Sequence, residues 1–202
     1  MNENTLEIYT EINRHLLQES KPSDYLNEIC NSSLFKKHPF IMLHNLKTAE
    51  QAPEHHPEGN VWVHTLLVVD EAAKVRSQSR NQAVFMWAAL LHDIGKPSTT
   101  RVRRDKITSY DHDKVGAKLT KEFLSVFTDD IIFIREVSEL VRYHMQILFV
   151  IKELPFADIR GMKRNTDINE VALLGLCDRL GRKNSDRDKE EENIRLFIEK
   201  CS

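Results

Sequence analysis

The sequence predicts an all-α protein with a small β-hairpin or loop insertion near residues 99–110. Two observations support this prediction. Apolar residues recur every three or four positions along most of the chain, which is the period of a helix packed on a core. Around residues 100–109 the pattern changes, because two short β-type stretches flank the charged run 103–106 (RRDK), as in a hairpin.

Composition and charge limit the class of protein. The 202 residues, 41% of them hydrophobic, are enough for one core. A net charge of −2 argues against strong, broad binding to nucleic acid. The N-terminus is polar and acidic, no apolar run is long enough to cross a membrane, and the three cysteines lack metal-type spacing. We therefore expect a cytoplasmic protein that has no membrane partner.

The first 45 residues are expected to form a helical packing segment. Helical spacing covers about Thr5 to Leu17, a short helix follows Ser23, and a third extends from Phe40 to Leu46. A loop with two prolines and a glycine then fills residues 51–60. Nothing in the first 45 residues indicates chemistry.

The next helix should run from Val61 to about Val75, with Asn60 as its N-cap. His64 lies in its first turn. A single histidine at such a position is more often a capping or surface residue than a ligand. Taken alone, His64 therefore indicates little.

A buried helix from Ala83 to Leu91 leads directly into His92 and Asp93. Gly95 is expected to cap this helix and Pro97 to stop it. Polar side chains at the inner end of a buried helix need partners. The pair indicates either metal ligands or a buried Asp–His hydrogen bond, and the two residues alone do not decide between them.

Three further positions carry ligand-type side chains. His112 begins a helix between two aspartates, as a solvated cap or as a ligand that those carboxylates orient. His144 shares the inner face of a helix that opens near residues 128–130, as a ligand or as a core histidine bonded to a carbonyl. Asp178 is an inward carboxylate on a helix that starts near Asp167, with Glu170 expected to complete a capping box.

One metal centre would explain all these residues together, whereas structural roles would need a separate reason for each of them. Imidazoles and carboxylates without thiolates suit one or two divalent ions, and Mg, Mn, Fe, Co, Ni and Zn are not distinguished. A carboxylate shared by two ions would permit a two-metal site. The candidate ligands are His64, His92, Asp93, His112, His144 and Asp178.

Several motifs in order resemble the HD superfamily of metal-dependent phosphohydrolases. More closely, they are similar to the HD domain of bacterial multifunctional tRNA nucleotidyltransferases, over about Leu46 to Arg182. The matching stretches are residues 53–65 (PEHHPEGNVWVHT), 88–97 (AALLHDIGKP), 110–112 (YDH) with 115–117 (VGA), and 176–182 (LCDRLGR).

The resemblance implies an all-α HD bundle over residues 46–183. The C-terminal amphipathic helix, within residues 184–202, would belong to the same globule and could also mediate a homodimer. One ion would be held by His64, His92, Asp93 and Asp178. In two-metal relatives, the positions of His112 and His144 hold a second ion, with Asp93 as the bridge. Lys96 would face the substrate phosphate.

The departures from the pattern narrow the function. The 45 leading residues are too few for a nucleotidyltransferase head, and the Gly-Tyr-Pro signature of cyclic-di-GMP phosphodiesterases is missing. We expect an HD domain that stands alone and hydrolyses a small phosphate ester, with Asp93 and Lys96 as catalytic residues. The resemblance favours a nucleotide or a 2′,3′-cyclic phosphate as the substrate.

Other basic residues are candidates for substrate binding, although each is more often a solvated surface charge. They are Arg101, Arg142, Arg179 and Arg182. Two alternatives to the enzyme remain. One is a non-catalytic nucleotide- or RNA-binding regulatory module that retains the metal pocket. The other is a metal-stabilised structural subunit of a larger assembly.

Overall fold

The computed structural model describes residues 3–104 and 106–202. Its α-helices are α1 (Glu3–Gln18), α2 (Ser23–Ile29), α3 (Ile41–His44), α4 (Val61–Val75), α5 (Gln82–Leu91), α6 (Lys96–Thr99), α7 (His112–Leu124), α8 (Ile131–Tyr143), α9 (Gln146–Ile151), α10 (Ile159–Asn165), α11 (Ile168–Leu180) and α12 (Arg187–Cys201). The 3₁₀-helices η1 (Asn45–Thr48) and η2 (Arg76–Gln78) follow α3 and α4. The strands β1 (Arg101–Arg103) and β2 (Lys106–Thr108) form an antiparallel hairpin. The predicted fold class, all-α with a small hairpin, is confirmed.

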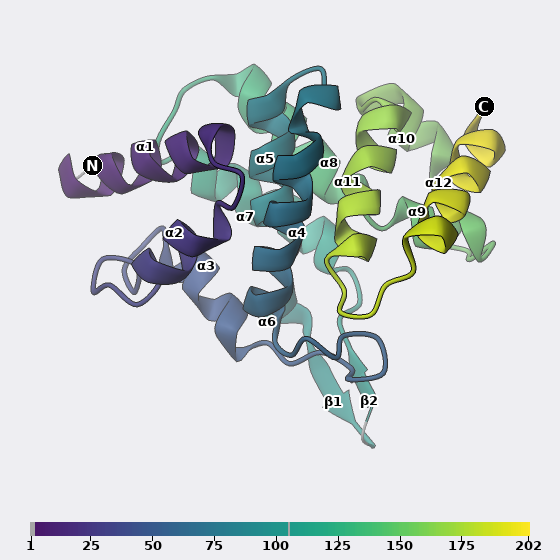
Figure 1. The fold of residues 1–202 in the computed structure, drawn as a ribbon, viewed down its shortest axis with the longest axis horizontal. Coiled ribbons are helices and arrows are strands. Elements are labelled where there is room, and N and C mark those ends of the chain that lie inside the picture. The colour runs from purple at the N-terminus through teal and green to yellow at the C-terminus, as the bar shows by residue number, and fades with distance from the viewer. Residues whose placement is uncertain (1–2, 105) are drawn as a thin grey trace.

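Helix α5 lies at the centre of the bundle, where α1, α4, α8 and α11 pack against it (Figure 1). All its residues from Val84 to Leu91 are buried. A helix that is apolar on every side is stable only when neighbours cover every side, which is the arrangement seen here. The C-terminal residues of α5, up to Leu91, are therefore shielded from solvent.

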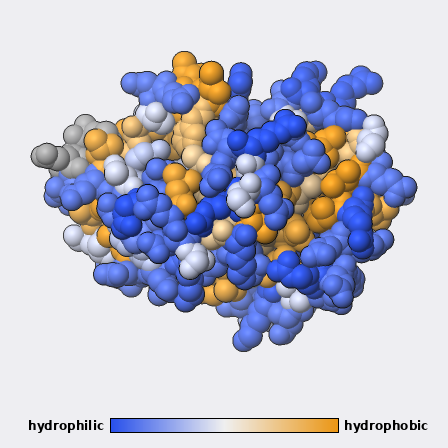
Figure 2. Space-filling model, turned by 45° about the horizontal axis from the view of Figure 1, so that its top comes forward, coloured by the Kyte–Doolittle hydropathy of each residue, from blue (hydrophilic) through white to orange (hydrophobic). Residues whose placement is uncertain are grey.

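The chain ends cover the same core from opposite sides. On α1, Tyr9 stacks on Trp87 with ring centroids 4.8 Å apart, and the Trp87 indole donates to Asn13 at 2.9 Å. At the other end of the chain, α12 packs on α9 and α11 and buries Phe197. The face drawn in Figure 2 is mostly hydrophilic, with smaller hydrophobic patches. Among the described residues, no helix has the length and apolarity that crossing a bilayer requires.

Several local expectations are wrong in detail. Gly95 has an ordinary helical φ of −79° and does not cap α5. Pro97 lies in the first turn of the short helix α6 and so begins a helix instead of stopping one. Asp167 does cap α11, but Glu170 accepts hydrogen bonds from Ser79 Oγ and Arg80 N, so there is no capping box.

The bundle is arranged so that five helices meet at one end. Helices α4 and α7 begin there, and α5, α8 and α11 end there. The hairpin projects from this same end (Figure 1). Asn60 caps α4 through a hydrogen bond from Val63 N, as predicted, and so fixes where that helix starts. Side chains near these helix ends are therefore brought together although they are far apart in sequence.

Candidate metal centre

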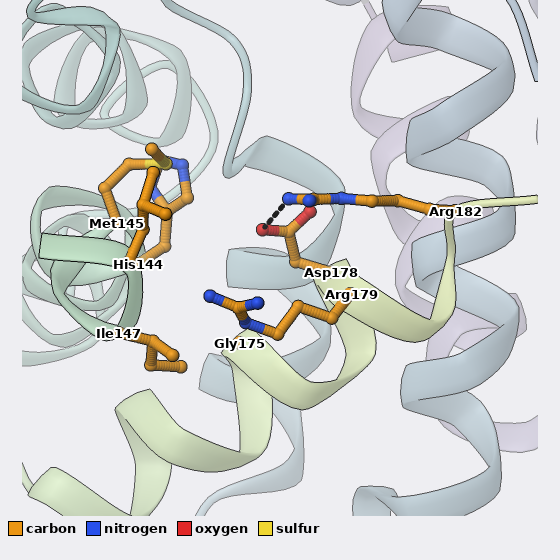
Figure 3. A pocket seen from close by; sticks show the side chains of 8 residues that line it. His144, Met145, Ile147, Gly175, Asp178, Arg179 and Arg182 are labelled. Atoms are coloured by element: carbon orange, nitrogen blue, oxygen red, sulfur yellow. Dashed lines mark ion pairs between the residues drawn. The ribbon is translucent and has the colours of Figure 1, made fainter. Parts of the chain in front are cut away.

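The imidazoles and carboxylates predicted as ligands lie at this end of the bundle, and all of them are buried. His64 is in the first turn of α4, His92 and Asp93 directly follow α5, His112 begins α7, His144 directly follows α8, and Asp178 is near the end of α11. His64 is fully buried, so it is not the surface residue that its position alone would suggest. His144 and Asp178 line the same pocket from two helices (Figure 3).

Asp93 is at the centre of the cluster, and its two oxygens face different groups. Its Oδ2 lies 3.2 Å from His92 Nε2 and 2.8 Å from Lys96 Nζ. Its Oδ1 lies 3.5 Å from His112 Nε2 and 3.8 Å from His144 Nε2. One carboxylate thus connects two sets of potential ligands.

Backbone carbonyls fix the tautomers of three histidines. In His92, His112 and His144, the Nδ1 atom is within hydrogen-bonding distance of a carbonyl oxygen three residues earlier. The acceptors are the carbonyls of Ala89 (2.9 Å), Ser109 (2.6 Å) and Val141 (2.7 Å). A carbonyl oxygen can only accept, so Nδ1 carries the proton and, in the neutral ring, Nε2 presents its lone pair. This is the state in which imidazole binds a metal ion.

The described residues offer these Nε2 lone pairs no adequate partner. Those of His112 and His144 lie 3.2 Å apart, where two neutral acceptors repel each other. His92 Nε2 is buried and forms no well-aligned hydrogen bond among the described residues, although Asp93 Oδ2 lies 3.2 Å away. Unpaired buried acceptors are costly unless a cation satisfies them. The donor set therefore fits a divalent metal ion.

The distances define two candidate metal sites that share Asp93. Ligand atoms of His64, His92 and Asp93 lie within 4.8 Å of one another, and so do those of Asp93, His112 and His144. Asp178 adjoins the first group, since its Oδ1 lies 2.9 Å from His64 Nε2. The protein thus offers imidazole and carboxylate ligands for one ion or for two.

The cluster's own charges shift its pKa values. Burial raises the pKa of Asp93, but the neighbouring His92 and Lys96 outweigh burial and hold it well below its usual range. Asp178 is likewise kept ionised by Arg182 and His64 against the effect of burial. Burial, with the nearby His112, lowers the pKa of His144 to about 4. At neutral pH these two carboxylates are therefore charged and His144 is neutral.

His92 differs from the other histidines. Burial lowers its pKa, but the adjoining Asp93 carboxylate more than compensates, so the pKa is raised overall. A bound cation would compete with the proton for Nε2 of this ring, because a metal ligand must be deprotonated. Metal binding at this position is therefore expected to weaken as the pH falls.

Three of the basic residues named from the sequence lie beside these ligands. Lys96 Nζ contacts Asp93 and donates to Gln51 Oε1 at 2.7 Å. Arg179 and Arg182 line a cavity of about 280 Å³ together with His144 and Asp178 (Figure 3). Arg182 Nη2 lies 3.5 Å from Asp178 Oδ2.

Two other basic residues are directed elsewhere. The Arg142 guanidinium pairs with Asp113 and lies over the Tyr143 ring. Asp113 therefore does not orient His112, whose Nδ1 instead donates to the Ser109 carbonyl. Arg101 is exposed on β1 and donates to the carbonyls of Ser98 and Thr100.

Two residues that sequence reasoning missed support the site from the loop before α4. Glu58 Oε1 lies 3.0 Å from His64 Nδ1 and 2.8 Å from His56 Nδ1, and the Glu58 side chain is 2% exposed. The Lys183 amide donates to its other oxygen at 3.1 Å. Gln51 holds Lys96. A loop has no periodicity to reveal which side chains point inward, and the position of Glu58 beside two histidines in sequence was the available signal.

Comparisons with known proteins agree with this geometry. Residues 61–183 match the family model described as the HD domain. The Multifunctional CCA protein of Methylococcus capsulatus (strain ATCC 33009 / NCIMB 11132 / Bath) is 29% identical over 166 residues, which cover 82% of this chain and 34% of the relative. That of Actinobacillus pleuropneumoniae serotype 5b (strain L20) is 39% identical over 83 residues, which cover 39% of this chain and 20% of the relative.

In each of these two alignments, the chain covers about a third or less of the relative's length. The matched family model, in contrast, spans more than half of this chain and includes every candidate ligand from His64 to Asp178. HD domains are in general metal-dependent phosphohydrolases. The chain belongs to the HD domain family.

Proposed function

We propose that this protein hydrolyses a phosphate ester in a metal-dependent reaction, with a nucleotide or a 2′,3′-cyclic phosphate as substrate. The observation that supports it most is the position of Asp93. Its two oxygens face two groups of imidazoles, and one oxygen also contacts the Lys96 ammonium at 2.8 Å. Carboxylate, imidazole and ammonium are thus gathered in one buried place.

The residues divide into two candidate sites. His64, His92, Asp93 and Asp178 would hold one ion, and Asp93, His112 and His144 would hold a second. A bound ion would supply Lewis acidity, which polarises the phosphoryl group and lowers the pKa of an attacking water. The carbonyls that accept from the Nδ1 atoms would keep the rings oriented, since partners of this kind fix both tautomer and ring angle.

The basic side chains would act on the phosphate. Gln51 holds the Lys96 ammonium next to Asp93, where a fixed cation can stabilise the negative charge that develops during hydrolysis. Arg179 is held by Glu190 at 2.9 Å and Arg182 lies near Asp178, so both guanidinium groups are positioned at the cavity. Guanidinium forks suit phosphate oxygens because they donate in pairs.

The cavity favours a small substrate. Its empty space is about 280 Å³, a figure that includes space open to solvent, so the room enclosed by its walls is small. Met145, Ile147 and Leu148 add an apolar wall opposite the arginines, which suits a nucleoside next to a phosphate. The likeness to Multifunctional CCA proteins also supports a nucleotide-like substrate.

Replacing Asp93→Asn tests the proposal, because it keeps the shape and removes the shared charge. We expect both loss of bound metal by elemental analysis and loss of turnover with bis-p-nitrophenyl phosphate and 2′,3′-cyclic AMP. The exposed Asp129→Asn variant is the matched control. An Asp93→Asn protein with full activity would refute the role. A wild-type protein that binds metal yet hydrolyses no phosphate ester would favour the non-catalytic binding module instead.

A further inference from the structure

The β1–β2 hairpin has a cationic face. Its register pairs Arg101 with Thr108 and Arg103 with Lys106. Cross-strand partners share a face and alternate residues of a strand share a face, so Arg101, Arg103 and Lys106 lie on one side. Val102 and its partner Ile107 lie on the other side. Arg104 follows at the turn with a φ of 48°, and all four basic side chains are exposed.

The residues that the structure describes do not neutralise these cations. None of them forms an ion pair with any residue in the described part of the chain. By contrast, the arginines of α12 are paired, for example Arg187 with Glu71 and Arg195 with Glu192. The sequence RVRRDK at 101–106 carries a formal charge of +3 within a protein of net charge −2. The positive charge is therefore local and available to an anionic partner.

The base of the hairpin is bonded directly to the candidate centre. Thr100 donates to the Lys96 carbonyl through both N (2.9 Å) and Oγ1 (2.8 Å). Thr100 Oγ1 and Ser109 Oγ are 2.8 Å apart, and the Ser109 carbonyl accepts from His112 Nδ1 at 2.6 Å. Thr100 directly precedes β1 and Ser109 directly follows β2, so the start of β1 and the end of β2 are each held next to a site residue. With a rise of about 3.3 Å per residue, the cations extend about 10 Å outward from that base.

We propose that this hairpin binds the phosphate backbone of a single-stranded RNA whose terminal phosphate ester enters the metal centre. The inference rests on the proposed function and names the substrate class more narrowly. Proteins that bind single strands combine a line of cations with exposed aromatic rings on which bases stack. Tyr110, which is 72% exposed, stands at the foot of the hairpin and supplies such a ring.

A terminal ester fits better than an internal one. The cavity beside the candidate ligands is small and no described hairpin residue lines it, so the hairpin can contact only the rest of the strand. Contacts from so few cations are salt-sensitive and local. They differ from the strong, broad binding against which the net charge argues.

The test measures binding separately from turnover. Fluorescence anisotropy would follow a labelled short RNA that ends in a 2′,3′-cyclic phosphate, with the full chain in chelator. The variant combines Arg103→Ala, Arg104→Ala and Lys106→Ala. The control combines Lys36→Ala, Lys37→Ala and Arg164→Ala, which removes the same charge from exposed positions elsewhere. Thermal melting of both variants would check that each is folded.

We expect the RNA to bind the wild type at least about ten times more tightly than 2′,3′-cyclic AMP does at low salt, because only the RNA reaches the hairpin. Each phosphate contact to a single strand contributes about 0.7 to the slope of log affinity against log salt. Losing three cations should therefore lower that slope by about 2, while the control keeps it.

Several results would overturn the inference. These are equal affinity for the RNA and the mononucleotide, equal loss in the hairpin and control variants, and hairpin-dependent binding to phosphatidylglycerol vesicles without binding to RNA. Turnover of bis-p-nitrophenyl phosphate by the same wild-type preparation separates the two proposals. Hydrolysis without hairpin-dependent RNA binding would refute the inference about RNA and leave the proposed function standing. Hairpin-dependent binding without any hydrolysis would support the hairpin's role and count against the proposed function.

Discussion

His112 and His144 face each other in the protein interior with their Nε2 atoms 3.2 Å apart. Each ring directs its Nδ1 atom to a backbone carbonyl, so at neutral pH neither Nε2 carries a proton with which to bond the other. Two buried lone pairs in this position destabilise the metal-free fold. A cation between them would convert the repulsion into two bonds.

Metal ions should therefore stabilise the folded protein. An ion present at about 100 times its dissociation constant adds about 2.7 kcal/mol to the free energy of unfolding. We expect Tm to fall when a chelator removes metal and to rise when Mn²⁺ or Zn²⁺ is returned, as measured by differential scanning fluorimetry. His144→Gln should reduce this rise, and the exposed His55→Gln should not. An identical rise in both variants would contradict the assignment of His144.

The metal-free protein should lose stability as the pH falls from about 6.5 toward 4. The pKa of His144 is lowered to about 4, by burial first and then by His112, and that of His56 is lowered to about 4 by burial and Lys96. Between these values and 6.5 the unfolded chain binds protons that the folded chain does not, so unfolding becomes easier. At about pH 5 the cost is about 2 kcal/mol for each group.

His92 acts in the opposite sense, because its pKa is raised. The contribution of His92 to the free energy of unfolding is fully present below the pKa that this residue has in the unfolded chain. It is lost as the pH rises through its pKa in the folded protein. Urea unfolding in chelator at about pH 7.5 and about pH 5 would measure the balance, which we expect to favour the higher pH. The His144→Gln variant should show a smaller pH effect. Equal stability of the wild type at both values would count against the burial of these neutral rings.

Gly95 should be essential to the centre because of close backbone packing. A Cβ at this position would lie 2.2 Å from the His112 carbonyl oxygen and 2.7 Å from Gly116 N. Gly95→Ala would push the start of α7 away from Asp93. We expect a loss of about 1–3 kcal/mol in urea unfolding, together with weaker metal binding.

Gly175→Ala is the comparison for Gly95→Ala. The three atoms nearest to its added Cβ all belong to the Ile147 side chain, with the terminal Cδ1 at 1.8 Å and Cγ1 at 3.2 Å, and no backbone atom is among them. We expect a smaller stability loss there, with the metal content retained. If the two variants were equally unstable, backbone contact would not explain the need for Gly95.

Glu58 should increase the affinity for metal, although it is not one of the candidate ligands grouped around Asp93. Its buried carboxylate lies 3.0 Å from His64 Nδ1, and hydrogen-bonding carboxylates of this kind orient ligand histidines. Glu58→Gln should weaken metal binding by about 10–100-fold in titration calorimetry. Glu54→Gln, an exposed change in the same loop, should leave affinity unaltered. A Glu58→Gln protein with wild-type affinity would remove this role.

The sequence by itself determined the helical class and the chemistry of the candidate site. Helical spacing marked α4 from Val61 to Val75, because burial of one face leaves a periodic pattern, and an unbroken apolar run marked the buried part of α5. The types and order of residues from His64 to Asp178 indicated imidazole and carboxylate ligands, because a metal's preference for donor atoms depends on residue type.

Only the tertiary structure decided how these residues meet. It showed that Asp93 faces two groups of histidines. It also showed that the Glu58 carboxylate contacts His64 and that Arg142 forms an ion pair with Asp113. It also corrected Gly95, which allows two backbones to approach each other and does not cap α5. These relationships depend on distances between helix ends and on carbonyls that fix ring tautomers. Such distances are set by packing between segments far apart in the chain, which leaves no local pattern in the sequence.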